Sequence, residues 1–254
     1  MDEVGRLQQW PSKQPDKVLV LAYLATKFNF EATYSETDVN EILKKWHTFN
    51  DWPLLRRELY DRNFLDRDAN GSNYRLMRIP TSQPGLLLVK PSLAQDANLS
   101  VKWLSGEAGR DTLRLMGSTD DNNQPSTLEA EKQRIRDFHI SSDQRTWSMR
   151  YEDKTVGAVW VDLKTTSYLT APSVHIMIGD PSMRRKGIGE AAILAIIKLL
   201  AKEGKYSTLY SRHLRTNQAS AKLLAKVGFV YDGQEYSDAD GLVYRNVKRG
   251  LTGS

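Results

Sequence analysis

Apolar residues recur every three to four positions in three segments near the start of the chain, which predicts three amphipathic helices. The first covers residues 16–28. The second follows Ser35, because a serine with Asp38 three residues later forms a capping-box pattern. The third begins after Asp51 and ends at Asn63, a residue type that tolerates the left-handed backbone conformation found at helix ends. A small helical domain is therefore expected in this part of the sequence.

A β-hairpin is expected directly after these helices. Two short apolar runs lie within residues 64–76 and flank Asn70-Gly71, a dipeptide typical of tight hairpin turns. Three helices followed by a hairpin make a winged-helix-like arrangement. We place this first domain at residues 1–80.

The composition changes between Pro80 and Pro91, where proline and glycine concentrate. We interpret residues 81–96 as a linker to a second domain that covers 97–254. The apolar run 86–89 inside the linker is open to two interpretations, a strand or an interdomain contact. A length of 254 residues agrees with two domains of ordinary size.

In the second domain, runs typical of strands alternate with runs typical of helices. Strands are predicted at 99–104, 145–150, 156–163, 174–178 and 206–214. Helices are predicted at 126–139, where Ser126 and Glu129 resemble a capping box, at 188–203 and at 217–228. The pattern predicts an α+β fold.

The composition excludes several classes of protein. Hydrophobic residues make up 40% and charged residues 26% of the chain, as in globular proteins. No apolar run approaches the roughly 18 residues of a membrane-spanning helix, and the acidic start of the chain does not resemble a signal peptide. A cytoplasmic protein without membrane contact is therefore expected. Cysteine is absent, which excludes disulfides, thiol nucleophiles and cysteine zinc sites, and no metal site is predicted.

Charge is distributed unevenly along the sequence. Residues 1–80 contain twelve basic and twelve acidic residues, so the net charge of +5 belongs entirely to residues 81–254. Nucleic-acid-binding domains usually carry a basic excess. Five arginines of the first domain could contact DNA phosphates or pair with neighbouring carboxylates: Arg56, Arg57, Arg62, Arg67 and Arg75. The balanced charge favours pairing, and we expect little or no DNA binding.

One segment of the second domain combines a predicted strand, a basic glycine loop and a long predicted helix. The loop is Arg184-Arg185-Lys186-Gly187-Ile188-Gly189-Glu190. Its two glycines allow a ligand to approach the backbone closely, and the free amides of a first helical turn attract an anion. The spacing differs from both the dinucleotide-binding fingerprint and the P-loop. The segment is therefore a candidate pyrophosphate-binding site.

Further motifs make this pattern more specific. Arg184-x-x-Gly187-x-Gly189, Asn217-x-x-Ser220 and Gly228-Phe229 together resemble the GNAT superfamily of acetyl-CoA-dependent acyltransferases. Ile176-Met-Ile-Gly-Asp180 and Gly189-Glu-Ala191 resemble its RimJ/RimL-like branch, which includes ribosomal-protein, polyamine and antibiotic acetyltransferases. The resemblance covers about 97–248. It implies a mixed, mostly antiparallel central sheet flanked by helices.

The first domain resembles a different family. Tyr34-Ser-Glu-Thr-Asp-Val-Asn-Glu-Ile-Leu43, Leu55-Arg-Arg-Glu-Leu59, Leu65-Asp-Arg67 and Gly71-Ser-Asn-Tyr-Arg75 are similar to a small bacterial domain of unknown function. That domain occurs in transcriptional regulators and fused to acetyltransferases. The resemblance covers roughly 15–80. A role in packing or as a substrate lid is favoured over DNA binding.

The GNAT resemblance implies roles for the residues around the glycine loop. Arg184 and the backbone of Arg185, Lys186, Gly187, Ile188, Gly189 and Glu190 would hold the pyrophosphate of acetyl-CoA. Met177, Ile178 and Gly179 would pair through their backbone with the pantetheine arm, and Asn217 would hydrogen-bond to the same arm. The side chains of Arg185 and Lys186 would either meet phosphates or lie exposed to solvent.

Acetyl transfer needs a neutral amine, a polarised thioester and a proton for the leaving thiolate. The tyrosine that serves the thiolate in many family members is replaced by Leu224. Ser220 is the first candidate for that role and Tyr210 the second, although Ser220 could equally be an ordinary surface serine. The candidates for the base are Glu235 and His175, each of which could instead be structural. A chain of water molecules could also replace both.

Acidic residues concentrate after the last predicted helix: Asp232, Glu235, Asp238 and Asp240. They would attract a cationic acceptor such as a polyamine, an antibiotic or a peptide amine, or they would form only a hydrated loop. We expect direct transfer of the acetyl group from acetyl-CoA to a primary amine. Two alternatives stay open, a transcriptional regulator that senses acetyl-CoA and a noncatalytic interaction module. The sequence does not identify the acceptor, and it is compatible with an oligomer.

Overall fold

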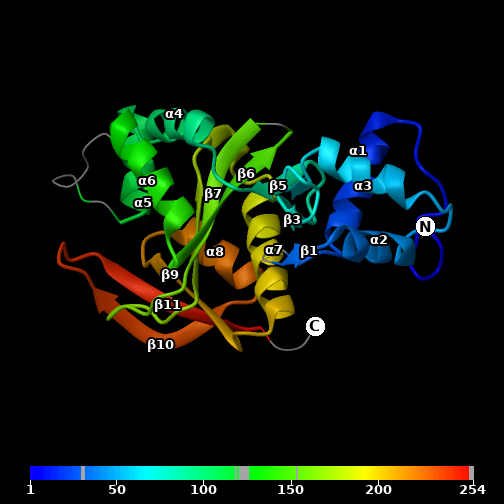
Figure 1. The fold of residues 1–254 in the computed structure, drawn as a ribbon. Coiled ribbons are helices and arrows are strands. Elements are labelled where there is room, and N and C mark those ends of the chain that lie inside the picture. The colour runs from blue at the N-terminus through cyan, green and yellow to red at the C-terminus, as the bar shows by residue number, and fades with distance from the viewer. Residues whose placement is uncertain (30–31, 118, 120–125, 153, 252–254) are drawn as a thin grey trace. The chain divides into compact units, whose positions relative to one another are not determined.

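The computed structural model of the chain describes residues 1–29, 32–117, 119, 126–152 and 154–251 (Figure 1). The chain forms two compact units, residues 1–89 and residues 90–254. No helix among the described residues is long and apolar enough to cross a membrane.

In its described residues, the first unit has three helices and a small sheet. They follow one another as α1 (Gln14–Ala25), β1 (Thr33–Tyr34), α2 (Glu36–Lys45), α3 (Trp52–Asp61), β2 (Leu65–Arg67) and β3 (Tyr74–Leu76). The three strands are antiparallel in the order β1-β3-β2. A second hairpin follows, formed by β4 (Arg78–Pro80) and β5 (Leu86–Val89). A small domain of helices and a hairpin is confirmed, while its winged-helix character stays a prediction.

Local sequence signals set the helix ends of the first unit. Ser35 caps α2: its Oγ accepts from the Asp38 amide at 3.1 Å, and the Asp38 carboxylate accepts from the Ser35 amide at 2.8 Å. Asp51 caps α3 by accepting from the Leu54 amide, and Asn63 ends it with a φ of 56°. Buried leucines on the inner faces of the helices fill the core of the unit.

Several arginines of the first unit are paired within it. The ion pairs are Arg56–Glu36 at 2.7 Å, Arg62–Glu58 at 2.9 Å and Arg75–Asp68 at 3.0 Å. Arg67 lies over the ring of Tyr60. This geometry fits the interpretation of these side chains as partners of neighbouring groups. The expectation of little or no DNA binding stays a prediction.

The second unit combines helices with a mixed sheet. Its elements are α4 (Leu93–Trp103), α5 (Gly106–Leu115), α6 (Leu128–Ile140), β6 (Gln144–Tyr151), β7 (Lys154–Asp162), β8 (Ser173–Ile178), the 3₁₀ turn η1 (Pro181–Met183), α7 (Ile188–Glu203), β9 (Thr208–Leu214), α8 (Gln218–Lys226), β10 (Val230–Ser237) and β11 (Val243–Gly250). Its strands lie in the order β10-β11-β9-β8-β7-β6, and among the described residues of this unit the β8–β9 pair is parallel while the other neighbouring pairs are antiparallel. The predicted α+β fold with a mixed, mostly antiparallel sheet is confirmed.

The prediction of a strand at 99–104 is wrong, because these residues belong to α4 and its C-terminal end. The buried positions are Asp96, Ala97, Ser100 and Leu104, which is helical spacing. Small and polar side chains occupy most of them, so a pattern of hydrophobicity does not reveal the helix. The segment interpreted as a linker, 81–96, contains β5 and the start of α4, and the domain bounds themselves stay a prediction.

The cap of α6 lies one residue later than predicted. Thr127 Oγ1 accepts from the Ala130 amide at 3.2 Å. Ser126 instead donates its hydroxyl hydrogen to Glu131, whose side chain is buried. Either residue type caps a helix well, so the sequence alone does not choose between the two positions.

Strands β8 and β9 diverge after their first residues. They pair only at Ser173 and Tyr210 in the described chain, where the Tyr210 amide donates to the Pro172 carbonyl at 2.9 Å. The next contact comes from a side chain: Ser211 Oγ donates to the Val174 carbonyl at 2.7 Å. On its other side β8 remains paired with β7 throughout. Beyond Ser173, the described backbone of β8 therefore has no strand pairing with β9, although the Ile178 carbonyl accepts from Arg184 Nε at 3.3 Å.

Candidate active site

A cavity of about 630 Å³ lies where β8 and β9 diverge. Ile176 and Ile178 face α7, because their Cδ1 atoms lie 3.5 Å from the point where a side chain at Gly189 would begin. Side chains alternate along a strand, so His175 faces the opposite side of the sheet, where its ring stacks on Trp160. All five residues line the cavity. The cavity therefore reaches both faces of the sheet.

The wall of the cavity on the α7 side is the N-terminus of that helix. Gly187 is the N-cap residue and has a φ of 79°, which a glycine adopts without steric cost. No side chain among the described residues caps the helix. Gly187, Ile188, Gly189 and Glu190 line the cavity, so the amides of the first turn are available to an anion there. A phosphate group fits this end of a 16-residue helix.

Arg184 and Asn217 line the cavity and also contact α5. Arg184 Nη2 donates to Thr112 Oγ1 at 2.9 Å. Asn217 uses its Oδ1 to cap α8, accepting from the Ser220 amide at 3.0 Å, and its Nδ2 donates to the Leu115 carbonyl at 3.1 Å. The two side chains expected to bind the cofactor thus hold the C-terminal part of α5 in this structure.

The remaining cofactor candidates differ in their relation to the cavity. Met177, Ile178 and Arg185 line it, whereas Gly179 and Lys186 are not part of its described lining. A side chain at Gly179 would begin 2.2 Å from the ring of Trp103 on α4. The absence of a side chain at Gly179 therefore serves packing against α4.

Two lysines of α8 also line the cavity, and sequence reasoning missed them. Lys222 and Lys226 lie four residues apart on one face of the helix. Lys226 forms an ion pair with Glu190 at 2.6 Å. The signal in the sequence is their spacing: two lysines four residues apart lie on one face of a helix, and this helix also carries the site candidate Ser220.

The four candidate catalytic residues do not come together. His175 and Ser220 line the cavity, whereas Tyr210 and Glu235 are not part of its described lining. Glu235 lies on β10 and forms an ion pair with Arg245 of β11. Of the two candidate bases, only His175 is placed beside the space where a ligand would bind.

The acidic segment after α8 shapes a turn. Asp232 accepts from the Gln234 amide at 2.9 Å, and Asp238 Oδ1 accepts from the amides of Asp240 and Leu242 at 3.1 and 2.9 Å. The carboxylates of Asp232, Asp238 and Asp240 are all outside the described lining of the cavity. Attraction of a cationic acceptor by this segment therefore stays a prediction without support from the cavity.

An aromatic cluster lies next to the cavity. Tyr168, Tyr236 and Tyr244 stack in series with ring centroids 4.7 and 5.2 Å apart. The Arg212 guanidinium lies over Tyr236 and Tyr244 and donates to the Tyr236 hydroxyl. Burial raises the pKa of Tyr236 and of Tyr244 although Arg212 acts in the opposite direction. Sequence reasoning missed this cluster because its members come from a loop and three different strands.

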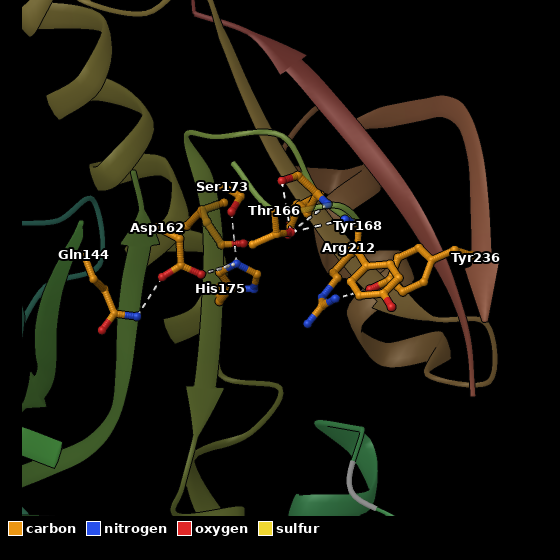
Figure 2. A network of polar contacts seen from close by, with 11 residues as sticks. Gln144, Asp162, Thr166, Tyr168, Ser173, His175, Arg212 and Tyr236 are labelled. Carbon is orange, nitrogen blue, oxygen red and sulfur yellow. Dashed lines mark hydrogen bonds and ion pairs between the residues drawn. The ribbon is translucent and has the colours of Figure 1, made fainter. Parts of the chain in front are cut away.

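A polar network connects β7 with β8 beside the cavity (Figure 2). Asp162 Oδ2 lies 3.2 Å from His175 Nε2, and Asp162 Oδ1 accepts from Gln144 Nε2 at 2.7 Å. Partial burial acts to raise the pKa of Asp162, but the hydrogen bonds and charges of its neighbours, His175 first, outweigh it and lower that pKa below 3.8. Asp162 is therefore a carboxylate at neutral pH.

Comparison with family models identifies the second unit. Residues 86–230, more than half of the chain, match the model described as the acetyltransferase (GNAT) domain. The chain belongs to the GNAT acetyltransferase family. Acetyl-CoA is the cosubstrate of GNAT acetyltransferases, as the resemblance implied. Residues 6–76 match a family described as an uncharacterized protein conserved in bacteria (DUF2087).

Solved GNAT acetyltransferases share this fold at low sequence identity. RimL, a ribosomal L7/L12 alpha-N-protein acetyltransferase in complex with coenzyme A, is 15% identical with a TM-score of 0.56 over 68% of this chain and 97% of its own. The microcin C7 self-immunity acetyltransferase MccE, in complex with acetyl-CoA and AMP, is 15% identical with a TM-score of 0.54 over 66% and 93%. Spermidine N-acetyltransferase from Vibrio cholerae, in complex with CoA and spermine, is 12% identical with a TM-score of 0.54 over 67% and 98%. A comparison with curated proteins gave no match.

Proposed function

We propose that this GNAT protein transfers the acetyl group of acetyl-CoA to a primary amine by direct attack of the amine. The observation that carries the proposal is the single cavity that runs from the uncapped N-terminus of α7 to His175 on the opposite face of the sheet. One end suits a phosphate, and the other presents a residue able to accept a proton. The chain has no cysteine, so an acetyl-cysteine intermediate has no place in the mechanism.

The residues of the cavity divide the binding of acetyl-CoA among them. The first-turn amides of α7, with Arg185 and Lys222, would neutralise the phosphates. The backbone of β8 would pair with the pantetheine arm, because beyond Ser173 it has no strand partner toward β9 in the described chain. The Val174 and Ile178 carbonyls accept from Ser211 Oγ and Arg184 Nε in this structure. Acetyl-CoA supplies the activated thioester, and Ser220 would donate a hydrogen bond to the leaving sulfur.

The acceptor is proposed to be a primary amine of a small cationic molecule, an antibiotic or a peptide. The support is the similarity of fold to three acetyltransferases. By their names, RimL is an alpha-N-protein acetyltransferase, another is a spermidine N-acetyltransferase, and MccE confers self-immunity to microcin C7. The lining of the cavity does not select one of these acceptors. Its wall near His175 combines aromatic rings with the positive charge of Arg212, so it has no single chemical character. The choice among these acceptors is therefore left to experiment.

One observation favours a second candidate, a module that binds acetyl-CoA without turnover. Leu224 occupies the position where many family members have a tyrosine for the thiolate, and it is buried with 3% exposure in the cavity wall. In that case acetyl-CoA would bind normally and no amine would be acetylated. Binding and turnover therefore have to be measured separately.

Binding is tested by calorimetry with acetyl-CoA on the full chain. Lys222→Glu reverses a charge in the cavity wall, and we expect about tenfold weaker binding, or about 1.4 kcal/mol. Lys198→Glu is the matched control, because Lys198 is exposed on α7 and is not part of the described cavity lining. No binding by the wild type, or equal affinity of both variants, would place the cosubstrate elsewhere.

Turnover is tested by release of coenzyme A thiol with spermidine, tyramine, kanamycin and a peptide with a free N-terminal alanine. We expect acetylation of at least one amine, and a larger effect of Ser220→Ala on kcat than on acetyl-CoA affinity. Binding without any turnover would select the noncatalytic alternative.

A further inference from the structure

His175 is held in one orientation by three neighbours. Its Nε2 lies 3.2 Å from Asp162 Oδ2 and 3.2 Å from Ser173 Oγ (Figure 2). Its ring stacks on Trp160 with the centroids 5.5 Å apart and the planes 19° apart. The side chain is 16% exposed. Such a set of contacts fixes both the position and the plane of the ring, which an incidental strand histidine would not require.

The contact with Asp162 also decides which ring nitrogen carries the hydrogen. A carboxylate only accepts hydrogen bonds, so the nitrogen that faces it must be the donor. Asp162 Oδ1 is occupied by Gln144, and Oδ2 faces His175 Nε2. Ser173 Oγ, at the same distance from Nε2, can accept from an N–H or donate to a lone pair. The carboxylate is therefore the contact that favours neutral His175 with the hydrogen on Nε2 and the lone pair on Nδ1. The other charged group near Asp162 is Arg212, which favours the same ionised carboxylate.

The cavity gives an acceptor room beside His175. His175 lines the cavity, and it faces away from α7, where the phosphates of the cosubstrate would bind. In Figure 2 the Nδ1 edge of the ring is turned away from Asp162. An amine that reaches the thioester from this face of the sheet would therefore meet the lone pair of His175 and not the carboxylate.

We infer that His175 is the base of the acetyl transfer and that Asp162 is its positioning residue. This inference rests on the proposed function. The bound ammonium gives one proton to His175 Nδ1. The neutral nitrogen then bonds to the acetyl carbon as the carbon–sulfur bond breaks, and the sulfur leaves with the electron pair and takes up the second amine proton. His175 returns its proton to solvent, so the reaction releases one proton for each amide formed.

The inference assigns different consequences to the two residues. Replacing His175 removes the proton acceptor, whose contribution in such reactions is typically 10²–10⁴-fold. Replacing Asp162 by asparagine keeps the shape but lets an amide N–H face Nε2, which favours the other tautomer and turns the N–H toward the amine. Ser173→Ala removes one contact that holds the ring but leaves the carboxylate that favours the tautomer, so it should lower kcat less than Asp162→Asn does.

The tautomer is read by NMR of the full chain labelled with ¹⁵N-histidine. The chain has four histidines, and the spectrum of His175→Gln identifies the signals of His175. We expect Nε2 to carry the hydrogen in the wild type and a change toward the Nδ1–H form in Asp162→Asn. A wild-type His175 with its hydrogen on Nδ1 would overturn the inference, and this readout needs neither cosubstrate nor acceptor.

Kinetics test the same two residues with whichever of the four amines gives the highest turnover. We expect kcat to fall about 100-fold in His175→Gln and at least tenfold in Asp162→Asn, with acetyl-CoA affinity unchanged in both. The matched control is Asp143→Asn, which makes the same chemical change at an exposed residue whose carboxylate accepts from the hydroxyl of the neighbouring Ser142 at 3.2 Å. It should retain wild-type kcat.

The possible results distinguish failure of the proposed acetyl transfer from failure of the assignment of His175 and Asp162. Wild-type turnover that persists undiminished in His175→Gln and Asp162→Asn would overturn the base and its positioning residue while leaving the proposed function intact. Failure of the wild type to acetylate any of the four amines would count against the proposed function, and against the base with it. Loss of acetyl-CoA affinity in His175→Gln, with kcat unchanged at saturation, would make His175 a binding residue and overturn its assignment as base.

Discussion

The Asp96 carboxylate is buried, with 6% exposure, and it ties the start of α4 to the β6–β7 hairpin. It accepts hydrogen bonds from the Ser92 amide at 2.8 Å, from Ser148 Oγ at 2.5 Å and from Thr155 Oγ1 at 3.1 Å. Three donors satisfy a carboxylate that would otherwise be costly to bury. Asp96 therefore fixes the position of α4 relative to the sheet.

Asp96→Ala should lower the free energy of unfolding by about 3 kcal/mol, because it leaves buried donors without an acceptor. Asp137→Ala, on the exposed side of α6, is a suitable comparison and should change stability by less than about 1 kcal/mol. Urea denaturation followed by circular dichroism measures both. Equal midpoints for the two variants would show that the three hydrogen bonds contribute little.

Individual site residues were predictable where they belong to a local motif. The glycine loop, Asn217 and Ser220 are recognised by their spacing, and all of these residues except Lys186 belong to the described lining of one cavity. Asp162 was not predictable, because it meets His175 only through the register of β7 with β8, in which Trp160 pairs with His175 and Asp162 with Ser173. Cross-strand register is a property of the assembled sheet and leaves no local trace in the sequence.

At the scale of single elements, the α2 cap gives a pH dependence. Hydrogen bonds from the Ser35 side chain and backbone lower the pKa of Asp38 below 3.8. A carboxyl group whose pKa is lower in the folded state stabilises that state above its unfolded pKa, and this contribution disappears as the pH falls through the folded pKa.

We therefore expect the stability difference between the wild type and Asp38→Asn to be constant from about pH 7 to pH 5 and to shrink below about pH 4. Urea midpoints at these pH values measure it. Glu41→Gln on the exposed part of the same helix serves as the control. A difference that grew on acidification would contradict the sign.

Elements with strong local signals were predictable, and those formed by tertiary contacts were not. The prediction for α7 at 188–203 agrees with Ile188–Glu203, because glycines mark both its ends. The region of α4 was misread because Leu99, Val101 and Trp103 alternate with polar residues, as they would in a strand. What makes this segment helical is the burial of Asp96 and Ser100, which depends on the sheet and on α6.

At the scale of the whole molecule, charge and chemistry are divided between the two units. The first unit carries balanced charge, and several of its arginines form ion pairs within it. The second unit holds the cavity and the entire excess of positive charge. A phosphorylated cosubstrate is attracted by such an excess. The domain bounds stay a prediction, and composition did not indicate that β5 and the start of α4 occupy the segment interpreted as a linker.

Arg184 and Asn217 donate to Thr112 and Leu115 of α5, and we predict that acetyl-CoA competes with the helix for these two donors. If acetyl-CoA recruits these side chains, each molecule that binds must first release Thr112 and Leu115. Part of the interaction energy is then spent on loosening α5, and the measured affinity for acetyl-CoA is lower than the contacts alone would give.

Thr112→Val removes one of these acceptors, so this variant should bind acetyl-CoA up to about tenfold more tightly, whereas Thr112→Ser should behave as the wild type. Hydrogen exchange would report the reciprocal effect, with amides of α5 in the wild type exchanging faster once acetyl-CoA is bound. Equal or weaker binding by Thr112→Val would mean that the helix and the cosubstrate are independent.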